Sequence, residues 1–177
     1  LAALCSVFFV FLGLFFSDSL GRMLGADDTM FSMTHTYLRV LLLFSPAFLF
    51  NHLFQCFVRN DGNPSLSTKA MVTGSCANIL LDYIFIFPLG MGIFGAIFAT
   101  GLAPVISMII LSAYGIAKKN QFHLVKEIQI TKRISVILSS GIPSFLTEAT
   151  SGIVMLLFNF IILRLTGNTG VAAFSIV

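Results

Sequence analysis

Two polar residues stand four positions apart in an otherwise apolar stretch near the middle of the chain. Asn78 and Asp82 lie within the run from Ala70 to Thr100, and on a helix this spacing places them on one face, one above the other. Pro88 to Gly92 interrupts the run, and Thr100 lies about as far beyond the interruption as Asp82 lies before it. If the two apolar segments form an antiparallel hairpin, the three side chains lie at a similar depth, roughly 10 to 15 Å from the turn.

These three side chains form a ligand set for a small cation. In a bilayer core about 30 Å thick their depth is near the middle, where a carboxylate is costly and seldom kept without a use. A carboxylate, an amide oxygen and a hydroxyl suit a hard cation such as Na⁺, and a proton could occupy the carboxylate instead. Either ligand neutralises Asp82. We therefore predict that Asp82 couples an ion gradient to a conformational change, with Asn78 and Thr100 as its partners and as Na⁺ ligands if sodium is the ion.

A second carboxylate, Glu148, lies in another apolar segment, five residues after Pro143. Its neighbours in sequence include the hydroxyl residues Ser144, Thr147, Thr150 and Ser151. A buried carboxylate in this setting could take a proton, pair with a cationic ligand or coordinate an ion, and its other role would be an interhelical hydrogen bond. We predict a functional role.

The composition indicates an integral membrane protein. Of the 177 residues, 57% are hydrophobic and 10% are charged, with a mean hydropathy of +0.99. Soluble domains carry about 25% charged residues, so this chain could not cover a globule with polar surface. The net charge is +3 and the basic residues are confined to particular loops, which does not indicate a nucleic-acid surface. Cys5, Cys56 and Cys76 have neither metal nor disulfide spacing and are expected to be buried small side chains.

Five apolar segments are long enough, or nearly so, to cross a bilayer, and a sixth begins near Gly170. They cover residues 1–16, 36–58, 68–87, 92–116 and 134–163. Backbone amides must be paired in lipid, and no segment shows the alternation of barrel strands, so the predicted fold is an all-α polytopic bundle. Pro46 and Pro143 predict kinks, and Asn51 with His52 gives the second segment a polar spot.

The loops between the segments differ in basic residues. Residues 17–35 hold one basic residue against three aspartates, residues 59–69 hold Arg59 and Lys69, and the Pro88–Gly92 turn holds neither Lys nor Arg. Residues 117–133 hold Lys118, Lys119, Lys126, Lys132 and Arg133. The positive-inside rule places loops 59–69 and 117–133 in the cytoplasm, as single crossings require. Turn residues Asn60 to Pro64 precede the third segment, which Ser65 or Ser67 is expected to cap.

Several motifs, in order along nearly the whole chain, resemble the multidrug and toxic compound extrusion (MATE) family. The Asn-Asp-Gly-Asn-Pro form of the first motif is similar to the MepA-like bacterial branch. The motifs are Arg59-Asn60-Asp61-Gly62-Asn63-Pro64, Asn78-x-x-x-Asp82-Tyr83, Gly92-Ile93-x-Gly95-Ala96-x-x-Ala99-Thr100, Gly141-Ile142-Pro143 and Gly167-Asn168-x-Gly170-Val171-Ala172-Ala173-Phe174.

The resemblance implies an internal fragment of a fold with two bundles of six helices each. Residues 1–116 would be the last four helices of the first bundle, 117–133 the basic cytoplasmic loop between bundles, and 134–177 the start of the second bundle. The family's amino-terminal cation site matches Asn78, Asp82 and Thr100, with a further aspartate on a first helix outside this sequence. Glu148 would correspond to an acidic residue of the seventh helix, and Asn159 to that aspartate in the second bundle. Both are candidates for the wall of the second-bundle cavity.

The function implied is cation-coupled antiport. We expect a secondary transporter, monomeric when full length, that uses Na⁺ or H⁺ to export amphipathic, often cationic drugs and toxic compounds across the cell membrane. No cofactor is expected besides the coupling ion. An enzyme is not expected, because the sequence has no HExxH, GxSxG or Walker motif and no Cys/His cluster.

Two other functions are compatible with the membrane topology. A lipid-linked oligosaccharide flippase or polysaccharide exporter of related architecture would line its cavity with basic residues for diphosphate. In this sequence the residues at membrane depth are acidic or neutral apart from Arg39. An ion channel would give passive flux that does not saturate, but the sequence shows no repeated filter-like segment.

Overall fold

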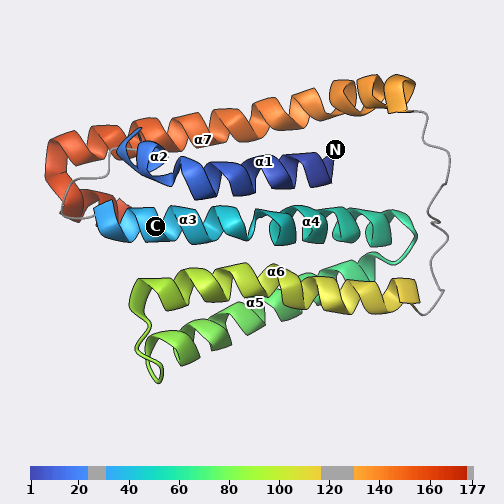
Figure 1. Cartoon of the computed structure of the whole chain (residues 1–177), viewed down its shortest axis with the longest axis horizontal. Helices are drawn as coiled ribbons and strands as arrows, with labels where there is room; N and C mark the ends of the chain where they lie inside the picture. The colour runs from blue at the N-terminus through green and yellow to red at the C-terminus, as the bar shows by residue number, and fades with distance from the viewer. Residues whose placement is uncertain (24–30, 117–129, 175–177) are drawn as a thin grey trace. The chain divides into compact units, whose positions relative to one another are not determined.

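The computed structural model describes residues 1–23, 31–116 and 130–174, and within these ranges the regular structure is entirely helical (Figure 1). The helices are α1 (Ala2–Phe15), α2 (Ser17–Met23), α3 (Phe31–Leu43), α4 (Ser45–Asn60), α5 (Pro64–Ile86), α6 (Gly92–Ile116) and α7 (Ile130–Phe174). The chain divides into two units, Leu1–His123 and Leu124–Val177, so that α1 to α6 form one unit and α7 belongs to the other.

Several of the described helices are long and apolar enough to span a membrane. Three pass by themselves, Pro64–Ile86, Gly92–Gly115 and Ser135–Gly167, and α3 with α4 makes a fourth if this bent pair crosses as one span. Helix α1 is apolar but shorter, with 14 residues. Large apolar side chains are exposed along these helices, as expected where lipid rather than water is the solvent. The all-α membrane fold is confirmed.

The kink expected at Pro46 is present, but the segment starts earlier than residue 36. Helices α3 and α4 meet at Phe44 with a bend of 45°, and Pro46 occupies the first turn of α4, where its missing N–H costs no hydrogen bond. At this bend the Phe44 ring packs against α6. A Cβ added to Gly101 of α6 would lie only 2.4 Å from Phe44 Cγ. Gly101 therefore makes room for the ring.

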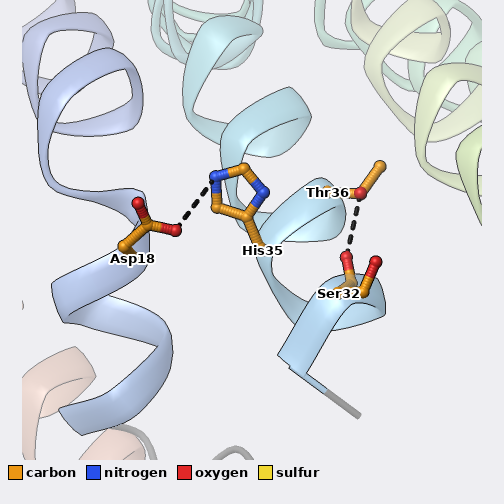
Figure 2. Close-up of polar contacts among 4 residues, drawn as sticks. All are labelled: Asp18, Ser32, His35 and Thr36. Carbon is orange, nitrogen blue, oxygen red and sulfur yellow. Dashed lines mark hydrogen bonds and ion pairs between the residues drawn. The ribbon is translucent and has the colours of Figure 1, made fainter. Parts of the chain in front are cut away.

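Residues 17–35, expected to be a connection, contain regular structure. Ser17–Met23 forms α2, and α3 begins at Phe31. Figure 2 shows one contact that joins them: His35 Nε2 lies 3.4 Å from Asp18 Oδ1. Arg22 also lies over the Phe31 ring, 5.0 Å from its centroid. These contacts stabilise a helix too short and polar to show in the hydropathy pattern.

Helix α5 begins at Pro64, four residues before the predicted start at residue 68, and the predicted caps were wrong. The side chain of Asn63 caps the helix by accepting a hydrogen bond from the Leu66 amide at 3.2 Å. Ser67 instead donates to the Gln55 carbonyl of α4 at 3.2 Å. The expected turn is present, with Gly62 at φ +85°.

The predicted antiparallel hairpin of α5 and α6 is confirmed, and α6 has the predicted bounds (Figure 1). The Met91 amide donates to the Phe85 carbonyl at 2.9 Å, and Gly90 adopts φ +62° in the turn. Near the middle the backbones approach closely, since a Cβ on Gly74 would lie 3.1 Å from the Ala103 carbonyl oxygen. Small residues at this crossing therefore bring the two polar faces together.

Helix α7 is interrupted at the point where the sequence predicts a new segment. Gly167 has φ 69° and ψ −164°, so the helix is interrupted between residue 163 and Gly170. Pro143 lies inside α7 without a non-helical residue, so the expected kink there produces no break. Most of the predicted inter-bundle loop, residues 117–129, lies outside the described residues, and the assignment of 1–116 and 134–177 to two bundles stays a prediction.

The cysteine prediction was wrong in one respect. Cys5, Cys56 and Cys76 are free, as expected, but all three are exposed rather than buried. On membrane-spanning helices an exposed thiol can face acyl chains, so apolar surroundings in the sequence do not require burial in protein.

Candidate functional site

A pocket of about 450 Å³ lies among α4, α5 and α6, at the crossing of the hairpin. Its wall combines apolar side chains with uncharged polar ones and contains no charged side chain. The lining residues are Phe48, Asn51, Gln55, Met71, Gly74, Ser75, Asn78, Ile79, Thr100, Ala103, Pro104 and Ser107. All of them belong to the unit formed by α1 to α6.

The structure brings two of the three predicted coupling residues to this pocket. Asn78 of α5 and Thr100 of α6 both line it, as the hairpin argument requires. The Thr100 hydroxyl donates to the Ala96 carbonyl at 3.0 Å. Its proton is therefore engaged by the backbone, and its oxygen presents lone pairs, as a cation ligand must. Asn78 Nδ2 is buried and has no hydrogen-bond partner among the described residues.

Asp82 lies one helical turn from Asn78, on the same face of α5, but does not line the pocket. The side chain is partly exposed, yet its Oδ1 atom is buried and lacks a hydrogen-bond partner in the described part of the chain. A buried carboxylate oxygen without a partner is costly, and such atoms in native proteins call for an explanation. A bound cation or proton would supply the missing partner.

Four polar residues of the pocket were not predicted as site residues. Asn51 and Gln55 come from α4, one turn apart, Ser75 comes from α5, and Ser107 comes from α6, two turns after Thr100. The sequence shows Asn51 only as part of a polar spot with His52, which is exposed and does not line the pocket. The i, i+7 spacing of Thr100 and Ser107 is a signal that a helical-face search could find.

The pocket does not have the makeup of a transition-metal site. Within the described ranges, no group of three or more His, Cys, Asp or Glu side chains could hold a metal ion. The oxygens of Asn51, Asn78, Thr100 and Ser107 belong to the amides and hydroxyls that hard cations accept. The chemistry available is therefore weak cation binding next to one carboxylate.

The second-bundle candidates both lie on α7, which is described by itself. Glu148 is exposed and Asn159 is partly exposed. The hydroxyls near Glu148 bond to the helix's own backbone: Thr147 donates to the Pro143 carbonyl at 3.0 Å and Ser151 to the Thr147 carbonyl at 3.1 Å. They do not preorganise Glu148, so its role in a cavity stays a prediction, as does that of Asn159.

Helices α4 to α6, which include spans long and apolar enough to cross a membrane, thus enclose a polar pocket, with an unpartnered carboxylate oxygen one helical turn from Asn78. Comparison with known proteins shows what the chain resembles. Residues 1–84 match the family model described as MatE. The multidrug export protein MepA of Staphylococcus saprophyticus is 27% identical over 172 residues, which are 96% of this chain and 38% of that protein.

Solved structures agree with the sequence match. A crystal structure of MATE in complex with MaL6 is 30% identical, with a TM-score of 0.82 over 98% of this chain and 39% of that one. An inward-facing multidrug resistance MATE family transporter of the MOP superfamily is 31% identical, with a TM-score of 0.73 over 96% and 41%. The chain is similar to these MATE transporters and spans about two fifths of their length.

Proposed function

We propose that this chain is part of a cation-coupled antiporter that exports amphipathic, often cationic organic compounds across the cell membrane. The observation that carries the proposal is the buried, unpartnered Oδ1 of Asp82, one helical turn from a pocket lined by Asn78 and Thr100. Homology to multidrug export proteins supports the substrate class. Either Na⁺ or H⁺ serves as the coupling ion, and no other cofactor is required.

The coupling works through the charge of Asp82. With the carboxylate ionised, Oδ1 needs a positive or hydrogen-donating partner, so a packing of the helices that gives it such a partner is favoured. When a cation or proton neutralises Asp82, the same face of α5 tolerates apolar neighbours. Ion binding thereby shifts the balance between two packings of the helices, which is what exchange of ion for drug requires.

The pocket itself suits the proposed substrates. Phe48, Met71 and Ile79 offer apolar surface, while Gln55 and Asn78 offer amide groups. A volume of about 450 Å³ lies within the range of drug-sized sites, at about 300 to 1,000 Å³. A flexible methionine in the wall of a pocket adapts to ligands of different shape. The pocket would thus contribute part of a wall for varied organic molecules.

The oligosaccharide flippase or polysaccharide exporter is less well supported. A diphosphate headgroup needs basic side chains, and neither Lys nor Arg lines the pocket. The proposed transporter is a monomer of the cell membrane with loops 59–69 and 117–133 in the cytoplasm.

The test is substrate transport by the full-length protein in sealed vesicles, with Na⁺ and pH gradients imposed separately. The proposal expects saturable transport of a cationic dye such as ethidium, driven by one of the two gradients, with counterflow of that ion. Flux that is passive and does not saturate would support a channel instead, and transport that ignores both gradients would contradict the proposal.

A further inference from the structure

The pocket extends away from Asp82 along one direction of the helix bundle. On α5 its lining runs from Ile79 back to Met71, toward the turn at Gly62. Ser107 of α6 lies level with Gly74 of α5, because its Cβ is 3.3 Å from where a Cβ on Gly74 would stand. Gly74 precedes Asp82 by eight residues, which is about 12 Å along a helix. The far part of the pocket is thus a separate location on the side of loop 59–69.

Two buried oxygens of pocket-lining residues have no hydrogen-bond partner in the described part of the chain. Ser107 is only 2% exposed, and its Oγ forms no hydrogen bond within the described residues. Asn51 Oδ1 is likewise buried and unpaired in the part of the chain that the structure describes. Ser112, the other serine near this end of α6, forms a hydrogen bond within its own helix, because its hydroxyl donates to the Met108 carbonyl at 2.7 Å. Ser107 therefore differs from an ordinary helix serine in lacking this bond.

Such atoms cost free energy unless a ligand or water pairs with them, and their chemistry limits the ligand. An anion is disfavoured because no basic side chain lines the pocket. A proton has no titratable group there to hold it. Amide and hydroxyl oxygens do bind Na⁺, more weakly than a carboxylate, and space for several water molecules allows the ion to keep part of its hydration shell.

We propose that Asn51 and Ser107 form a second, uncharged station for Na⁺, roughly two helical turns from Asp82 toward loop 59–69. This inference rests on the proposed antiport and specifies sodium as the ion. A sodium ion released from Asp82 binds transiently to the uncharged oxygens of Asn51 and Ser107 before it leaves toward the cytoplasmic side. Weak binding at this station keeps the ion from being trapped between the carboxylate and the aqueous exit.

The experiment measures the Na⁺ concentration that gives half-maximal exchange of ethidium in proteoliposomes of the full-length protein. The variants are Asn51→Leu, Ser107→Ala and the matched control Ser112→Ala, with Asp82→Asn as the reference for the proposed function. The midpoint of thermal unfolding in detergent reports whether each variant is folded. Loss of one sodium ligand should raise the half-maximal Na⁺ concentration about fivefold in Asn51→Leu and in Ser107→Ala. Ser112→Ala should match the wild type.

The outcomes separate the two proposals. If Asp82→Asn loses coupling while Asn51→Leu and Ser107→Ala keep the wild-type dependence on Na⁺, the second station is wrong and the proposed antiport stands. Exchange that responds to a pH gradient and not to Na⁺ also overturns the station. Gradient-driven exchange in Asp82→Asn at the wild-type rate contradicts the proposed function itself.

Discussion

At the scale of single residues, the candidate site depends on oxygens that lack partners. Asp82 Oδ1, Asn51 Oδ1 and Ser107 Oγ are all buried without a hydrogen bond among the described residues. Lone unpaired atoms of this kind are uncommon in native proteins because nothing offsets their lost hydration. Their concentration at and beside one pocket is the basis for proposing a polar or charged ligand there.

Thr100 gives a prediction at this scale. Its hydroxyl proton is committed to the Ala96 carbonyl, so its oxygen is a fixed acceptor for the coupling ion. Thr100→Val removes that oxygen with little change in shape and should weaken apparent ion affinity by about fivefold, or about 1 kcal/mol. Thr100→Ser keeps the hydroxyl and should retain most of the affinity. The measurement is the ion concentration for half-maximal exchange, and equal values for both variants would contradict the role of the oxygen.

The cap of α5 gives a second prediction. Asn63 accepts from the Leu66 amide, whereas Ser65, which the sequence offered as a cap, forms no such bond in the structure. Asn63→Ala should lower the stability of the folded protein by about 1 kcal/mol, seen as a lower midpoint of thermal unfolding in detergent. Ser65→Ala is the control and should leave the midpoint unchanged. A larger loss for Ser65→Ala would show that the serine caps the helix after all.

At the scale of helices, the sequence predicted the α5 and α6 hairpin and its polar face well. Asn78 and Thr100 line one pocket because the helical period and the Pro88 to Gly92 turn leave little choice of register. Asn51 and Ser107 were not predictable in this way. Their place in the site depends on how α4 crosses the hairpin, and that crossing depends on the size and direction of the bend at Phe44. Pro46 predicts a kink there but does not specify its angle. Helix α2 was missed because it has only seven residues and is too polar to show in the hydropathy pattern.

The packing of α4 on α6 can be tested at Gly101. A Cβ added to Gly101 would lie 2.4 Å from Phe44 Cγ. Because Cγ is the ring atom closest to the Phe44 backbone, the ring cannot easily move away from the added methyl group. Gly101→Ala should therefore destabilise the protein by about 1 to 3 kcal/mol through overpacking. Gly115→Ala in the same helix meets nothing within 4 Å and should be neutral or slightly stabilising. Equal thermal midpoints for the two variants would show that Phe44 does not seat on Gly101.

At the scale of the whole molecule, orientation in the membrane follows from loop charge. The turn after α4 and the turn between α5 and α6 lie at opposite ends of α5, and only the first is flanked by basic residues. We predict that Asn60→Cys reacts with a membrane-impermeant maleimide from the cytoplasmic side and Leu89→Cys from the outside. Both positions are exposed, and the native Cys5, Cys56 and Cys76 must first be replaced by alanine because they are exposed too. The reverse labelling pattern would contradict the orientation.

The central claim is that neutralisation of Asp82 couples ion flow to drug export, and Asp82→Asn tests it most directly. The substitution keeps the shape of the side chain but leaves it uncharged at every pH. In vesicles of the full-length protein with an imposed ion gradient, the variant should still bind ethidium, but the gradient should no longer drive its transport. Gradient-driven transport at the wild-type rate would contradict the claim.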